Sequence, residues 1–145
     1  MNDEIDLETI KNKISKRIKD YYKDNLVSIV YYGNHLRGKT VEIDVLVIIE
    51  RPYDPVKMNR IADFVENIRD PVEKEYGVQL LFDLYTKEEA ENFHVGYLDI
   101  AEAYEIIYDK DNYFNKLIKE MADPNKAIKH VEYLNIEYIS IDKNN

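Results

Sequence analysis

Apolar side chains recur every three or four positions over residues 7–22, with charged residues between them, at Leu7, Ile10, Ile14, Ile18, Tyr21 and Tyr22. This spacing places them on one face of an α-helix and predicts an amphipathic helix that Asp6 caps. Residues 26–32 (LVSIVYY) are instead continuously apolar and rich in β-branched side chains, which predicts a buried strand ending at Gly33. We expect residues 34–37 to form a short helix or turn that Gly38 closes.

A second strand is predicted at residues 41–49 (VEIDVLVII). Its pattern alternates at the start and is then wholly apolar, as expected of a central strand whose first half opens onto a site. Two prolines in the following ERPYDP end the strand. Asp54 is then expected to cap a helix that starts at Pro55, is interrupted at residues 69–71 (RDP) and ends at Gly77.

The rest of the chain predicts one more strand and several helices. The strand covers residues 78–85 (VQLLFDLY), and a capping box of Thr86 and Glu89 starts a helix that runs to about Phe93. Helices are expected over residues 98–104 and 112–121, a short strand or extended segment over 104–109, and an edge strand over 135–141. This order predicts an α/β (α+β) fold in which helices flank a mixed sheet of three to five strands.

The length and charge of the chain restrict the classes of function. Its 145 residues suit one domain, and we expect a core over about residues 7–109 with a helical C-terminal extension over 110–145. A formal net charge of -9 repels nucleic-acid phosphate and anionic membrane over most of the surface, although a local basic pocket could hold a nucleotide. The longest apolar run is too short to span a bilayer, and the N-terminus lacks a signal-peptide pattern, so we expect a cytoplasmic protein. Without cysteine, disulfides, thiolate zinc sites and cysteine nucleophiles are excluded.

Two carboxylates interrupt the otherwise apolar second strand. Glu42 and Asp44 project on the same side, because side chains alternate along a strand. Two anions about 7 Å apart at their backbones repel each other unless they are in water or share a cation. A solvated strand face is the commoner explanation, but this strand continues directly into VLVII, which belongs in an interior. Magnesium or manganese, which take oxygen ligands, would suit the pair.

Two further features are consistent with a phosphate and metal site. Asp83, near the end of the third strand, completes a three-carboxylate cluster if that strand pairs beside the second. Gly33 and Asn34 follow the first strand, where free backbone N–H groups attract phosphate. The alternative for these two residues is an ordinary tight turn with a positive φ at Gly33 and Asn34 as an N-cap. Either Tyr31 or Tyr32 borders this point, and we expect both to belong to the core.

Together, the motifs YGNHLRG, EIDVLVI and FDLYTKEE resemble those of the nucleotidyltransferase superfamily that includes DNA polymerase beta, in particular its minimal MNT-type members. EAYEIIYD is similar to the end of the minimal domain, so that the resemblance covers roughly residues 7–109. It implies that Glu42 and Asp44 hold the metal ions, with Asp83 as the third ligand and the base. It also implies that Gly33 and Asn34 contact the phosphates of a nucleoside triphosphate, and that Arg37 adds positive charge.

The resemblance implies transfer of a nucleoside monophosphate, with AMP from ATP as our preferred case, to a hydroxyl acceptor. Stand-alone members of the family are often antitoxins that modify a tyrosine of a helical HEPN toxin, which suggests a partner protein as the acceptor. This chain departs from the motif at Asn34, where the family has serine, and at Glu42, where it has aspartate. The alternative is therefore a catalytically degenerate fold that binds nucleotide or protein. The sequence leaves the nucleotide and a homo-oligomeric state open.

Overall fold

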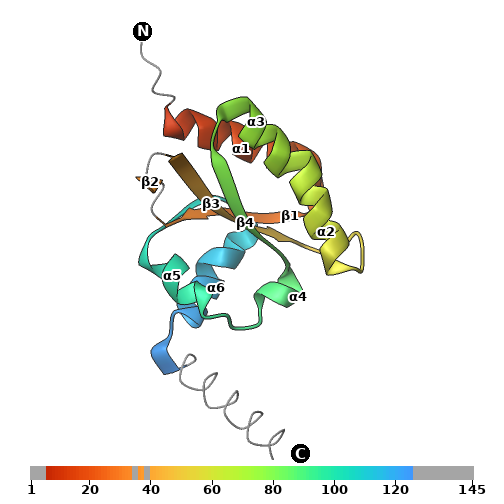
Figure 1. Cartoon of the computed structure of the whole chain (residues 1–145). Helices are drawn as coiled ribbons and strands as arrows, with labels where there is room; N and C mark the ends of the chain where they lie inside the picture. The colour runs from red at the N-terminus through yellow and green to blue at the C-terminus, as the bar shows by residue number, and fades with distance from the viewer. Residues whose placement is uncertain (1–5, 34–35, 38–39, 126–145) are drawn as a thin grey trace, which may run out of the picture.

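A computed structural model describes residues 6–33, 36–37 and 40–125 of the chain. One sheet runs through the middle of the molecule, with α1, α2 and α3 on one side and α4, α5 and α6 on the other (Figure 1). The helices are α1 (Leu7–Tyr22), α2 (Lys57–Phe64), α3 (Asp70–Tyr76), α4 (Lys87–Ala90), α5 (Gly96–Glu102) and α6 (Tyr113–Met121). The strands are β1 (Leu26–Tyr32), β2 (Leu36–Arg37), β3 (Thr40–Ile49), β4 (Gln79–Thr86) and β5 (Tyr104–Asp109).

The sheet is mixed, and β3 is its central strand. β3 pairs antiparallel with β1, which in turn pairs antiparallel with β5. It also pairs in parallel with β4, from Glu42 opposite Gln79 to Ile49 opposite Thr86. The two-residue β2 pairs only with Thr40 and Val41 at the start of β3. The parallel β3–β4 pair requires a long crossover, and the α2–α3 segment supplies it.

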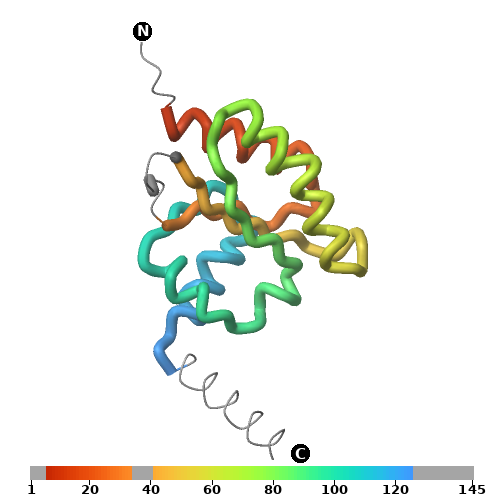
Figure 2. Tube along the Cα trace, in the orientation of Figure 1, coloured from red at the N-terminus to blue at the C-terminus, as the bar shows by residue number. Residues whose placement is uncertain are grey.

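Each face of the sheet carries its own apolar cluster. Ile43, Val45 and Val47 of β3 pack with α1, α2 and α3 in one cluster. Leu46 and Ile48, which alternate with them, pack with α4, α5 and α6 in the other. The sheet is therefore covered on both faces, which explains why the second half of β3 is continuously apolar. The described chain starts at α1 on one side and ends beyond α6 on the other (Figure 2).

The predicted fold class is confirmed, and most predicted elements are present. The helix of residues 7–22 with its Asp6 cap, β1, β3 and the capping box of Thr86 and Glu89 are as expected. The helix after α4 starts at Gly96 and ends at Glu102, and residues 104–109 form a true strand. The edge strand expected over residues 135–141 lies outside the described residues.

Other predicted boundaries are wrong, for identifiable reasons. α2 starts at Lys57 rather than Pro55, because Val56 has extended backbone angles (φ −86°, ψ 114°), although the Asp54 carboxylate accepts the N–H of Val56 as a cap would. No break occurs at RDP, because residues 65–69 wind as a π-helical turn and Pro71 then lies in the first turn of α3, where its missing N–H costs nothing. α4 ends at Ala90 rather than near Phe93. None of the described helices has the length and apolar character needed to cross a membrane.

Candidate active site

Two predicted site residues, Asp44 and Asp83, project from the same face of the sheet as Tyr32. Asp44 on β3 lies opposite Tyr32 on β1, and Asp83 on β4 aligns with Leu46, two positions beyond Asp44. Because residues two apart on a strand share a face, Tyr32, Asp44 and Asp83 all project toward the side of α4, α5 and α6. The prediction that Asp83 pairs beside the second strand and shares the face of Asp44 is confirmed.

Tyr32 joins the outer two strands of this group. Its hydroxyl donates a hydrogen bond to Asp83 Oδ2 at 2.8 Å, across the intervening β3. Burial raises the pKa of the Tyr32 phenol, and the negative charges of Asp83 and Asp44 raise it further. The phenol is therefore held in its protonated, donating form. Of the two tyrosines before Gly33, Tyr31 is fully buried in the core as expected, whereas Tyr32 belongs to the site.

A small cleft opens beside the Tyr32–Asp83 hydrogen bond. It has a volume of about 130 Å³, and its lining includes Tyr85, His94 and Tyr97. The rings of Tyr85 and His94 stack with centroids 5.1 Å apart. Burial raises the pKa of Tyr85 to about 12, with the Asp83 carboxylate contributing. The cleft thus has aromatic walls next to a carboxylate.

The positions of Tyr85 and His94 in the lining of the cleft were not predicted from the sequence. Tyr85 lies two positions after Asp83, so strand alternation alone places the two on one face. The His94 ring stacks on Tyr85, which is an ordinary packing contact. Its Nε2 atom is nevertheless buried without a hydrogen-bond partner in the described structure. No pattern in the sequence indicates that it lines the cleft.

The predicted metal ligands are placed on a common face but not grouped as a cluster. Asp44 is only 6% exposed, whereas Glu42, at the start of β3, is partly exposed. Among the described residues, no three acidic, histidine or cysteine side chains are grouped to hold a metal. Magnesium commonly uses one or two carboxylates together with substrate phosphates, so the oxygen donors of Asp44 and Asp83 suit it. The metal roles of Glu42, Asp44 and Asp83 stay predictions.

The expected phosphate loop differs from the prediction. Gly33 has the positive φ of 77° that the alternative of an ordinary tight turn predicts, and its N–H donates to the Ala103 carbonyl at 3.2 Å. Leu36 and Arg37 form β2 and pair with β3 instead of forming a short helix, so the described part of this loop provides no helix N-terminus for an anion. Asn34 and the side chain of Arg37 lie outside the described residues.

The fold matches solved toxin–antitoxin structures over nearly the whole chain. A chain in the structure of the tri-AMPylated Shewanella oneidensis HEPN toxin in complex with MNT antitoxin matches with a TM-score of 0.56 and 14% identity, covering 94% of this chain and 96% of that one. A chain in the MntA-HepT toxin–antitoxin structure matches with a TM-score of 0.51 and 17% identity, covering 94% and 97%. This chain has the MNT-type nucleotidyltransferase fold.

Two further similar proteins have related descriptions. A chain in a toxin-antitoxin structure with AMP-PNP matches with a TM-score of 0.53 and 16% identity, covering 92% of this chain and 96% of that one. The Methanocaldococcus jannaschii protein "Putative protein adenylyltransferase MJ1305" is 27% identical over 140 residues, covering 89% of this chain and 90% of that protein. No family model matches the chain.

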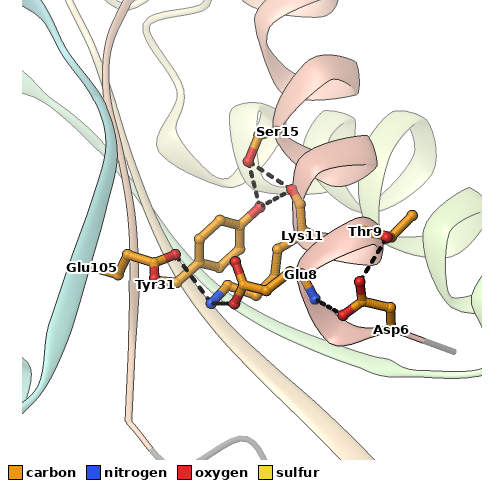
Figure 3. A network of polar contacts seen from close by, with 7 residues as sticks. All are labelled: Asp6, Glu8, Thr9, Lys11, Ser15, Tyr31 and Glu105. Atoms are coloured by element: carbon orange, nitrogen blue, oxygen red, sulfur yellow. Dashed lines mark hydrogen bonds and ion pairs between the residues drawn. The ribbon is translucent and has the colours of Figure 1, made fainter. Parts of the chain in front are cut away.

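A buried lysine holds α1 against the end of β1. Lys11 is 3% exposed, and its Nζ lies 3.2 Å from Glu8 Oε1 and 3.2 Å from Glu105 Oε1 (Figure 3). The same ammonium lies 5.2 Å from the centre of the Tyr31 ring. Tyr31 Oη donates to the Lys11 carbonyl and also bonds Ser15 Oγ (Figure 3). These contacts fix α1 against β1 and β5 on the face opposite Tyr32.

Proposed function

We propose that this protein is a metal-dependent nucleotidyltransferase that transfers AMP from ATP to a hydroxyl of a partner protein. The observation that carries the proposal is the placement of Tyr32, Asp44 and Asp83 on one face, with the Asp83 carboxylate at the edge of an open cleft. The relative described as a protein adenylyltransferase supports this reaction class. The similar structure with AMP-PNP, an ATP analogue, supports ATP as the donor.

In the proposed reaction the hydroxyl oxygen of the acceptor attacks the α-phosphorus of ATP, and Asp83 accepts the proton of that hydroxyl. The new bond joins that oxygen to AMP, the bond from the α-phosphorus to the bridging oxygen breaks, and pyrophosphate leaves. Asp44, with Glu42 nearby on the same face, would hold magnesium or manganese. Such a bound divalent ion would neutralise the charge of the triphosphate. Asp83 borders the cleft, so an acceptor hydroxyl entering there would meet it directly.

The proposed acceptor is a hydroxyl of a HEPN-type partner protein. One similar structure contains a tri-AMPylated HEPN toxin in complex with an MNT antitoxin, which supports both the partner and the modification. The cleft beside Asp83 is small, with aromatic walls, and is suited to a side chain rather than to a nucleic-acid strand. On this proposal the protein acts as an antitoxin, in the cytoplasm. Whether it forms a homo-oligomer stays open.

The alternative is a catalytically degenerate fold that binds nucleotide or protein but no longer transfers a nucleotide. It is favoured by Glu42 and Asn34 at the motif positions, and by the Gly33 N–H, which is already donated to Ala103. Restoring the motif with the pair Glu42→Asp and Asn34→Ser separates the two functions. Increased transfer by the double variant would identify an enzyme of reduced activity, whereas continued inactivity would favour the binding module.

The proposal is tested by incubating the protein with α-labelled ATP, magnesium or manganese, and a purified HEPN-type protein. We expect label on the partner from the wild type and none from Asp83→Asn. Asp63→Asn is the matched control. Asp63 lies on α2, on the opposite face of the sheet from the site, and its carboxylate accepts hydrogen bonds from the hydroxyls of Tyr21 and Tyr53. Equal labelling by wild type and Asp83→Asn, or none by the wild type with any nucleotide, would contradict the proposal.

A further inference from the structure

Tyr32 lies opposite one carboxylate of the site, Asp44, and donates a hydrogen bond to the other, Asp83. Adjacent strands lie about 4.8 Å apart, so β1 and β4 are separated by about 10 Å across β3. Tyr32 and Asp83 therefore meet only because both side chains lean over β3, where Asp44 lies directly opposite Tyr32.

The hydrogen bond between them is of a strong kind. A phenol that donates to a carboxylate forms a charge-assisted bond, and Tyr32 Oη lies 2.8 Å from Asp83 Oδ2. A carboxylate accepts several hydrogen bonds, so binding at Oδ2 fixes the plane of Asp83 without occupying both oxygens. The hydroxyl of Tyr32 consequently sets the direction in which Asp83 presents its other oxygen.

We propose that Tyr32 is a positioning residue that orients Asp83 for proton transfer from the acceptor. This inference rests on the proposed function, since it gives Asp83 the role of the base. Removing the hydroxyl leaves the ring in place and loosens the hold on the Asp83 carboxylate, which Tyr85 also contacts. A misplacement of about 1 Å at a reacting group costs up to about a hundredfold in rate. The loss should appear in kcat, because the proposed function assigns the binding of metal and ATP to Asp44 and not to Tyr32.

The matched control is the neighbouring tyrosine on the other face. Tyr31 also has a buried hydroxyl with two hydrogen bonds, to Ser15 and to the Lys11 carbonyl, but it does not contact Asp83. Tyr31→Phe therefore reports the structural cost of removing a tyrosine hydroxyl from the same strand. Tyr32→Phe removes a hydroxyl of the same kind together with the contact to the base.

The test measures kcat and the KM for ATP with a HEPN-type protein and N-acetyltyrosinamide as acceptors. Tyr32→Phe is expected to lower kcat about tenfold to a hundredfold with an unchanged KM for ATP, while Tyr31→Phe keeps the wild-type kcat. In an Asp83→Asn background, Tyr32→Phe should cause no further loss, because the hydroxyl acts only through Asp83. If Asp83→Asn has no measurable rate, the comparison of the two single tyrosine variants decides.

The outcomes separate the two proposals. Wild-type transfer together with an unchanged kcat in Tyr32→Phe would overturn the positioning role and leave the proposed function in place. An equal loss in Tyr31→Phe, or an additive loss in the Asp83→Asn background, would overturn it as well, because either result indicates a structural effect. No transfer by the wild type to either acceptor would overturn the proposed function and this inference with it.

Discussion

The guanidinium of Arg60 on α2 lies 2.7 Å from the Glu89 carboxylate on α4, although the two helices lie on opposite faces of the sheet. The Arg60 side chain is 4% exposed, and it also donates to the Asp54 carbonyl. Glu89 at the same time closes the capping box with Thr86 at the end of β4. One ion pair therefore joins the loop after β3, α2 and the start of α4 around one end of the β3–β4 pair.

We predict that Arg60→Ala destabilises the protein by about 3 kcal/mol. Breaking a buried pair from one side costs about 3–5 kcal/mol, and the partial exposure of Glu89 places the loss at the lower limit. The matched control is Arg69→Ala, whose exposed pair with Asp70 contributes less than about 1 kcal/mol. Urea unfolding of both variants measures the difference. A loss for Arg60→Ala no larger than that for Arg69→Ala would show that the pair is not structural.

The stabilisation by Glu89 should depend on pH. Burial alone would raise the pKa of this carboxyl, but the Thr86 N–H and the Arg60 charge lower it below its ordinary 4.5. A depressed pKa contributes stability that is fully present above pH 4.5 and is lost as the pH falls through the folded-state value. The stability difference between wild type and Glu89→Gln should therefore be constant near neutral pH and shrink below pH 4.5. A difference that grows on acidification would contradict this assignment.

The Lys11 ammonium should contribute less than its burial suggests. Glu8 and Glu105 are both well exposed, so that removing Lys11 leaves two solvated carboxylates rather than a buried charge. Lys11→Met keeps the apolar stem beside Tyr31, and we expect a loss below about 1.5 kcal/mol. Lys11→Ala should lose more, because the stem packing is also removed. Thermal unfolding of the two variants checks this order. The reverse order would show that the charge of Lys11 contributes more to stability than the packing of its stem.

The patterns that depend on local periodicity predicted the fold well. The six apolar positions of α1 predicted a helix, because a helix that is covered on one face carries apolar residues every three or four positions. The continuous apolar run of β3 predicted a buried strand, because a strand that is covered on both faces is apolar throughout. The boundaries failed where the backbone departed from the regular helix that the pattern predicts. Val56 is extended before α2 begins, and the π-helical turn carries the helix past Pro71.

The site was predicted in part for a similar reason. Alternation placed Glu42, Asp44 and Asp83 on one face once β3 and β4 pair in parallel. The hydrogen bond from Tyr32 was not predictable, because it joins residues 51 positions apart through a strand that lies between them. Gly33 has the positive φ that the tight-turn alternative predicted, and its N–H is donated to the carbonyl of Ala103, which directly precedes β5.

Titration of ATP into the protein by calorimetry, with magnesium or manganese, tests the central claim that Asp44 belongs to a metal and nucleotide site. Asp44→Asn keeps the shape of this buried side chain and removes its charge. Asp20→Asn is the control, because the ion pair of Asp20 with Lys16 lies on the exposed face of α1. We predict metal-dependent ATP binding by wild type and Asp20→Asn, and loss of binding in Asp44→Asn. Unchanged binding by a folded Asp44→Asn variant, or no nucleotide binding by the wild type, would contradict the account.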